Sequence, residues 1–431
     1  MTDAAIAWGK VVGARKFGMT SPAQRSVGYQ VLLTALLSVN FGFVLFDRNA
    51  LSFLMPFIQP DLALNNTEVG VLAGALSLTW ALAAFGVGVI ADRVGSPKRL
   101  LILATLAFSI CSFGSGLARS FAMLLGARLL MGLAEGGVMP VSQSLIATEV
   151  DARHRGLAMG VAQGFGSSLM GSFVAPVMLV AFATAFGWRH AFFLAGVPGL
   201  LMALLMVYFI REPEGRGVNT VPARSGGGYL RDSLADRNII LCALLGVLLV
   251  SYLVVCWTFM PLYLTQVRKY DPATMGWLMG VLGICATLAS TVIPALSDRI
   301  GRRPVMIAMP PLATILPFAA LYYTSSAWGL AALFFVGWTV TGIFPLFMAA
   351  VPSESVRPQH VATALGICMG TGEIIGGVLS PIISGYAADG FGLQAPLWIM
   401  LSLALSSALA ALGLRETAPR VVTSAPAYKM I

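Results

Sequence analysis

Apolar stretches separated by short polar segments recur along the whole chain. Each stretch holds about 18 or more mainly hydrophobic residues, the length that a helix needs to cross about 30 Å of hydrocarbon. Irregular backbone and open strand edges cannot face lipid, so the pattern predicts membrane-spanning helices. The twelve predicted spans are 30–58, 66–91, 99–118, 121–147, 157–185, 189–210, 238–265, 273–297, 304–323, 328–352, 360–387 and 394–414.

The spans fall into two sets of six that resemble one another. At an offset of about 206 residues, GVIADRVGSPKR from Gly88 corresponds to PALSDRIGRRP from Pro294, and LAMGVAQGFGSSLMG from Leu157 aligns with TALGICMGTGEIIGG from Thr363. The repeat predicts an all-α integral membrane protein with twelve transmembrane helices in two pseudo-symmetric six-helix bundles. We expect an N-terminal segment 1–29, a first bundle 30–210, a linker 211–237, a second bundle 238–414 and a tail 415–431.

The distribution of positive charge predicts how the chain is oriented in the membrane. Of the 431 residues, 58% are hydrophobic and 10% are charged, and the net charge is +9. Of the 27 Lys and Arg residues, 21 lie in the termini and in one alternating set of loops, which by the positive-inside rule predicts that both termini are cytoplasmic. The positive charge therefore sets topology and does not indicate a nucleic-acid partner. We expect a multi-pass protein of the plasma membrane, such as a bacterial inner membrane.

The loop after the second span carries a known motif. Ala91-Asp92-Arg93-Val94-Gly95 has the Ala-Asp-Arg-x-Gly pattern by which the chain resembles the major facilitator superfamily, and it is partly repeated in the second half. The resemblance implies the major facilitator fold and a cytoplasmic gate formed by Asp92, Arg93, Asp298 and Arg299. The alternative is that these residues only cap helix ends and fix topology.

Three further segments narrow the resemblance. FDRNALS at 46–52, RLLMGLAEGGVMP at 128–140 and GWRHAFFLAGVPG at 187–199 are similar to the anion:cation symporter family. This similarity implies transport of an organic anion such as a sugar acid or an aromatic or aliphatic carboxylate. Leu45 stands where that family often has a tyrosine, so the sequence disfavours a heavily hydroxylated substrate.

Five ionisable residues lie deep within the predicted spans: Asp47, Arg48, Arg128, Glu135 and Glu373. Each costs about 2.5–3.5 kcal/mol at the centre of a membrane helix, so we expect them to face a cavity or a partner. Arg128 and Glu135 are seven residues apart and share a helix face, about 10.5 Å apart along the axis, so we expect both to line one cavity. The adjacent Asp47 and Arg48 diverge by about 100°.

Arginine suits carboxylate recognition because its guanidinium donates two parallel hydrogen bonds and stays charged when desolvated. The family resemblance assigns Arg48 and Arg128 to the substrate, and Asp47 and Glu135 to proton coupling. Alternatively, the four residues are ion pairs that hold the first and fourth spans in register.

Other candidates have weaker support. Glu373 is interpreted as a third proton site or as a latch toward the arginines, with a structural, protonated acid as the alternative. Gln163 and Tyr263 are candidate substrate contacts, with an interhelical hydrogen bond and an interfacial anchor as their respective alternatives. The sequence shows no metal-ligand spacing and no catalytic constellation.

These observations predict a proton-coupled symporter that imports a small organic anion, without a cofactor and as a monomer. Sodium coupling stays open. A proton-driven exporter of hydrophobic cations or drugs is the nearest alternative, although the two buried arginines would repel a cation. A polytopic membrane enzyme or sensor is disfavoured, since either requires a catalytic constellation or an additional soluble domain.

Overall fold

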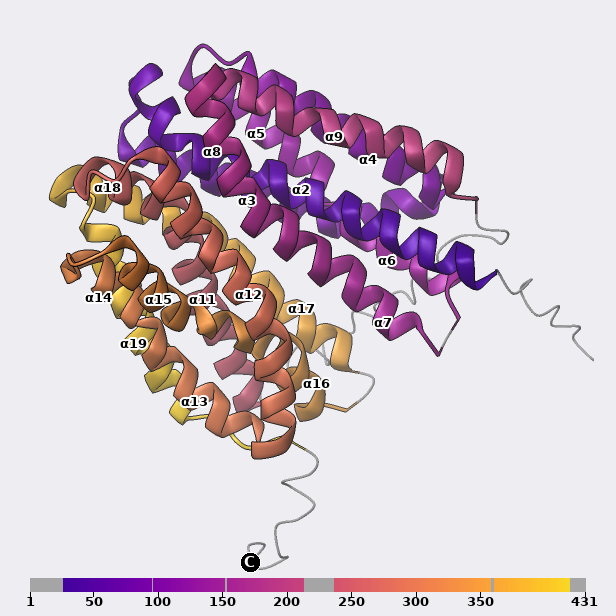
Figure 1. The fold of residues 1–431 in the computed structure, drawn as a ribbon. Coiled ribbons are helices and arrows are strands. Elements are labelled where there is room, and N and C mark those ends of the chain that lie inside the picture. Colours follow the sequence, from indigo (N-terminus) through magenta and orange to yellow (C-terminus); the bar gives the residue numbers. More distant parts are fainter. Residues whose placement is uncertain (1–25, 95, 152, 213–235, 358–359, 419–431) are drawn as a thin grey trace, which may run out of the picture.

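The computed structural model describes residues 26–94, 96–151, 153–212, 236–357 and 360–418. Twelve helical spans in this part of the chain are long and apolar enough to cross a membrane, as predicted. The segments 1–25, 213–235 and 419–431, which include most of the expected N-terminal segment, linker and tail, lie outside the described residues. The first six spans and the last six form two bundles side by side, the N-terminal and C-terminal halves (Figure 1).

The helices of the N-terminal half span residues 27–209. They are α2 (Val27–Asp61), α3 (Asn66–Val94), α4 (Pro97–Gly116), α5 (Phe121–Glu135), α6 (Val138–Glu149), α7 (Arg155–Gly160), the π-helices η1 (Val161–Phe165) and η2 (Ser167–Val174), α8 (Ala175–Phe186) and α9 (Trp188–Phe209). Ser96 and Ser120 begin α4 and α5 by accepting a hydrogen bond from a backbone amide of the first turn.

The helices of the C-terminal half span residues 237–412. They are α11 (Arg237–Leu262), η3 (Tyr263–Val267), α12 (Pro272–Ile300), α13 (Arg302–Ala313), α14 (Ile315–Tyr322), α15 (Ala327–Trp338), the 3-10 helix η4 (Thr339–Ile343), η5 (Leu346–Ala350), α16 (Val351–Ser355), α17 (Val361–Thr371), η7 (Gly372–Leu379), α18 (Ser380–Phe391) and α19 (Ala395–Leu412). Asp236 and Asp271 cap α11 and α12.

Departures from regular helix recur at matching places in the two halves. The π-helices η2 and η7 occupy equivalent positions of the glycine-rich repeat, and η2 packs against α2 and α12 as η7 packs against α11 and α3. Gly187 and Gly392, with φ of 86° and 81°, make equivalent tight turns before α9 and α19. Widened helical turns are common at functional sites. Here they lie where the halves meet.

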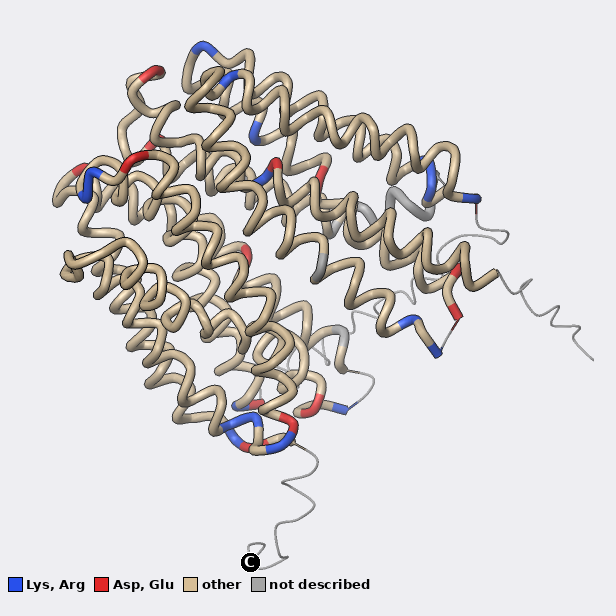
Figure 2. The backbone as a smooth tube through the Cα atoms, in the orientation of Figure 1, with Lys and Arg blue, Asp and Glu red and all other residues tan. Residues whose placement is uncertain are grey.

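Each span begins and ends at one of two faces of the molecule. We call the face with the described chain ends, residues 26 and 418, the terminal face, and the opposite one the distal face. Figure 2 shows that charged residues gather toward these two ends and are sparse between them.

Three layers of contact join the halves between the molecular centre and the distal face. Innermost, Phe53 meets Trp257 edge-on, with ring centroids 5.5 Å apart. Farther out, the Gln266 side-chain amide donates to the Gln59 carbonyl over 2.7 Å. At the distal surface, the Asp389 carboxylate accepts hydrogen bonds from the backbone amides of Asn66 and Thr67, over 2.8 and 2.9 Å. The halves are therefore closed against one another on the distal side.

Candidate functional site

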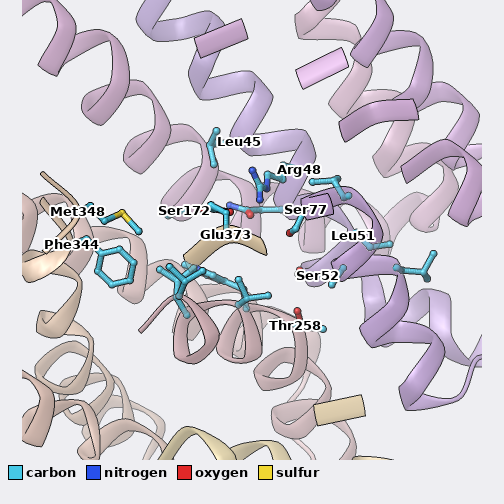
Figure 3. A pocket seen from close by; sticks show the side chains of 18 residues that line it. Leu45, Arg48, Leu51, Ser52, Ser77, Ser172, Thr258, Phe344, Met348 and Glu373 are labelled. Carbon is cyan, nitrogen blue, oxygen red and sulfur yellow. The ribbon is translucent and has the colours of Figure 1, made fainter. Parts of the chain in front are cut away.

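A cavity of about 350 Å³ lies between the halves, on the inner side of the Phe53–Trp257 contact. Most of its wall is apolar, and the polar groups come from both halves (Figure 3). The lining residues are Leu45, Arg48, Asn49, Leu51, Ser52, Leu72, Ala73, Leu76, Ser77, Ser172, Val250, Leu253, Val254, Trp257, Thr258, Phe344, Met348 and Glu373. A mainly apolar cavity with a few polar groups is typical of small-molecule binding.

Arg48 and Glu373 are the charged side chains of this lining, and they come from different halves. Arg48 projects from α2 with its guanidinium carbon 5.0 Å from the centre of the Trp80 ring. Glu373 projects from η7 of the C-terminal half into the same lining. The salt bridges formed among the described residues join Arg189 to Asp61 and Arg302 to Asp298 and Glu354, and none joins Arg48 to Glu373.

Asp47 points away from the cavity into the N-terminal half. Its side chain is fully buried, and its Oδ1 accepts a hydrogen bond from the Ser112 hydroxyl over 2.7 Å. The divergence expected for consecutive helical residues therefore places Arg48 in the cavity and Asp47 behind it.

Arg128 and Glu135 lie in the same buried region as Asp47. Arg128 donates to the Ser115 hydroxyl over 2.8 Å and sits 5.0 Å from the centre of the Phe192 ring. Among the described residues, Arg128 Nε and Nη1, Asp47 Oδ2 and both carboxylate oxygens of Glu135 have no hydrogen-bond partner. Electrostatic interactions couple Asp47, Arg128 and Glu135, which we call the buried trio.

The structure differs here from the expectation that Arg128 and Glu135 line the cavity. Both side chains are fully buried, since α5 packs against α3 and α4 of its own half and Arg128 bonds to Ser115 of α4. A direct contact of Arg128 with substrate would require another conformation.

Gln163 and Tyr263 also stand outside the cavity lining. Gln163 is an exposed residue of η1, whereas Tyr263 is only 2% exposed and packs in the hydrophobic core. The aromatic side chains of the cavity lining are Trp257 and Phe344.

Of the four predicted gate residues, only Asp298 and Arg299 have side chains that the structure describes. The side chains of Asp92 and Arg93 lie outside the described residues. Asp298 pairs within its own half with Arg302 over 2.6 Å, and Arg302 in turn binds Glu354 over 3.0 Å. Arg299 is exposed at the terminal face.

Several polar residues of the site escaped sequence reasoning. Ser112 donates a hydrogen bond to Asp47, and Ser115 accepts one from Arg128. Ser77, Ser172 and Thr258 belong to the cavity lining. A serine or threonine in a membrane helix commonly hydrogen-bonds within its own helix. Residue type alone therefore gave no signal for these positions.

Comparison with known proteins places this architecture in one family. The model of the Major Facilitator Superfamily matches residues 37–271 and 243–429. The chain belongs to the major facilitator superfamily, and it is therefore a multi-pass membrane transporter and not an enzyme. A solved structure of a variant of the nucleoside transporter NupG has the same fold, with a TM-score of 0.74 at 16% identity over 88% of this chain and 99% of that one.

Curated relatives include carriers of organic acids. The chain is 30% identical to a probable 4-methylmuconolactone transporter of Cupriavidus pinatubonensis, over 78% of this chain and 80% of that protein. It is 27% identical to the hexuronate transporter of Bacillus subtilis, over 80% and 85% of the two chains. A multidrug resistance protein, MdtG of Dickeya zeae, is 26% identical over 88% and 94%.

Proposed function

We propose that this protein is a proton-coupled symporter that imports a small organic anion by alternating access, with Arg48 as the ligand of the substrate carboxylate. The observation that carries the proposal is the placement of Arg48 at a largely apolar cavity between the halves, without a salt bridge among the described residues. A guanidinium at an apolar cavity that forms no salt bridge with a carboxylate favours an anionic ligand. The similarity to organic-acid transporters agrees with this choice.

Coupling to protons is proposed for the buried trio. Asp47 is adjacent to Arg48 on α2, so an anion bound to Arg48 brings negative charge close to two buried carboxyl groups. At about 5 Å and an effective dielectric of about 20, such a contact costs about 3 kcal/mol, which favours uptake of a proton by one of them. Arg128 then serves to balance the acids from inside the half, with Ser112 holding Asp47 and Ser115 holding Arg128.

Three features support alternating access. The cavity lies between two pseudo-symmetric halves, the distal side is closed by contacts between them, and matching helices carry the irregular turns. If the positive-inside rule sets the orientation, the terminal face is cytoplasmic and this conformation is closed toward the outside. We propose that it functions as a monomer in the plasma membrane.

An exporter of hydrophobic cations is the second candidate. Glu373, Trp257 and Phe344 in one cavity suit a hydrophobic cation, and MdtG is among the relatives. Arg48 in the same cavity opposes it, because a cation there meets a like charge. We therefore rank this function below anion import.

Ligand binding to the purified protein distinguishes anion import from cation export. We expect organic carboxylates, but not hydrophobic cations or neutral sugars, to raise the thermal unfolding midpoint. The effect should disappear in Arg48→Ala and persist in Arg119→Ala, an exposed arginine of the distal surface. Stabilisation by cations alone would contradict the proposal.

A further inference from the structure

The cavity carries opposite charges on its two walls. Arg48 comes from α2 in the N-terminal half and Glu373 from η7 in the C-terminal half, and both side chains line the same mainly apolar cavity (Figure 3). A site for a simple carboxylate ligand would need Arg48. The side-chain carboxylate of Glu373 would add nothing to the binding of such a ligand.

The position of Glu373 is held by its surroundings. A Cβ placed at Gly377, one helical turn further along η7, would lie 3.5 Å from Glu373 Oε2 and 3.6 Å from the Ser77 hydroxyl of α3. The carboxylate therefore lies over Gly377, at the interface with the N-terminal half. These spacings are ordinary van der Waals contacts, so Glu373 and Ser77 of the other half lie side by side next to Gly377.

Arg48 does not neutralise Glu373 directly. Its guanidinium stacks on Trp80, and no salt bridge among the described residues joins it to Glu373. Glu373 Oε1 and Oε2 are thus acceptors at a cavity whose other charged group is a donor. A bare anion at Arg48 would bring a like charge toward Glu373, and at about 5 Å that repulsion would lower affinity more than tenfold.

We infer that the substrate carries a hydrogen-bond donor, a hydroxyl or an ammonium group, in addition to its carboxylate, and that Glu373 accepts this donor while Arg48 binds the carboxylate. The inference deepens the proposed function and rests on it. The rest of the substrate is apolar, because Trp257, Phe344 and Met348 belong to the same cavity lining. Leu45 at the cavity is consistent with a single donor rather than many hydroxyls.

Matched carboxylates test the inference on the purified full-length protein. The probes are benzoate with its meta-hydroxy and meta-aminomethyl derivatives, and pentanoate with its terminal hydroxy and amino derivatives. Dissociation constants are measured for the wild type, for Glu373→Gln and for the control Glu212→Gln, an exposed residue beyond α9. We expect the wild type and Glu212→Gln to prefer at least one donor-bearing derivative over its parent by about tenfold, the worth of one charge-assisted hydrogen bond.

In Glu373→Gln the preference for the amino derivatives should fall to about one, while the hydroxy derivatives lose less because the amide oxygen still accepts. If benzoate and pentanoate bind the wild type as tightly as their hydroxy and amino derivatives do, the inference is overturned and the proposed function stands. The wild-type ratios decide this even if the variant does not fold. If no carboxylate of the panel binds, while hydrophobic cations do, the proposed function itself fails.

Discussion

The carboxylate of Asp389, near the end of α18, accepts hydrogen bonds from the backbone amide and the hydroxyl of Thr67, over 2.9 and 2.6 Å. Thr67 lies in the first turn of α3, so an acid of one half caps a helix of the other and meets the positive end of its dipole. These bonds exist only while the halves are closed on the distal side.

Asp389→Ala should therefore raise the fraction of molecules open at the distal face. The loss of a helix cap is worth about 1 kcal/mol, which is about a fivefold change in that equilibrium. Distances between spin labels on the exposed distal residues Arg119 and Ser325 report the two states. Asp271→Ala is the matched control, because Asp271 caps α12 within one half. An equal effect of both substitutions would contradict the assignment.

A second prediction concerns the close approach of α3 and α18. A Cβ at Gly385 would overlap the carbonyl oxygen of Asn66, whereas one at Gly390 on the same helix meets nothing within 4 Å. Gly385→Ala should shift the same spin-label distances toward the open distal state by at least about fivefold, since overpacking costs about 1–3 kcal/mol. Gly390→Ala should leave them unchanged, and a shift in that variant would point to helix flexibility instead.

The two arginines should behave differently. Arg48→Ala removes a cavity residue and should abolish carboxylate binding with little change in the thermal midpoint. Arg128→Ala leaves two buried acids without their balancing charge, a change worth about 3–5 kcal/mol, and should lower the midpoint by several degrees. Arg128→Lys should restore stability only in part, because a lysine cannot reproduce the guanidinium geometry. Equal stability of Arg48→Ala and Arg128→Ala would contradict this division of roles.

Substitutions of Asp47 and Glu135, the two acids of the buried trio, should abolish proton-driven accumulation while substrate binding remains. A permanently neutral side chain imitates the protonated state, so Asp47→Asn and Glu135→Gln should retain exchange of labelled for unlabelled substrate while losing accumulation against a gradient. Both processes are measured in proteoliposomes. If both variants accumulate substrate like the wild type, the proton is carried elsewhere.

Much of the fold could be predicted from the sequence because a bilayer imposes a strict requirement. Each span must be long, apolar and helical, so hydropathy located all twelve helices, and the offset repeat located the two halves. The π-helices η2 and η7 lie in the glycine-rich repeat, but the sequence did not predict them. Helix ends shifted by a few residues because caps such as Ser96 and Asp271 decide them.

The site could be predicted only in part. The cost of burying charge identified Asp47, Arg48, Arg128, Glu135 and Glu373, but periodicity could not tell which of Asp47 and Arg48 faces the other half. That choice depends on Ser112 of α4, which holds Asp47 inside its bundle. Asp389 escaped notice because an acid near the end of a span looks like any residue at the membrane surface.

Transport driven by an imposed gradient shows whether an organic anion bound at Arg48 is imported together with protons. Wild type and Arg48→Ala are reconstituted in proteoliposomes, and uptake of the carboxylate that most stabilises the wild type is followed with an acidic exterior, with a sodium gradient, or with neither. The account predicts accumulation by the wild type under the pH gradient alone, abolished by a protonophore and absent in Arg48→Ala. Uptake that ignores the pH gradient, or that persists in a well-folded Arg48→Ala protein, would contradict it.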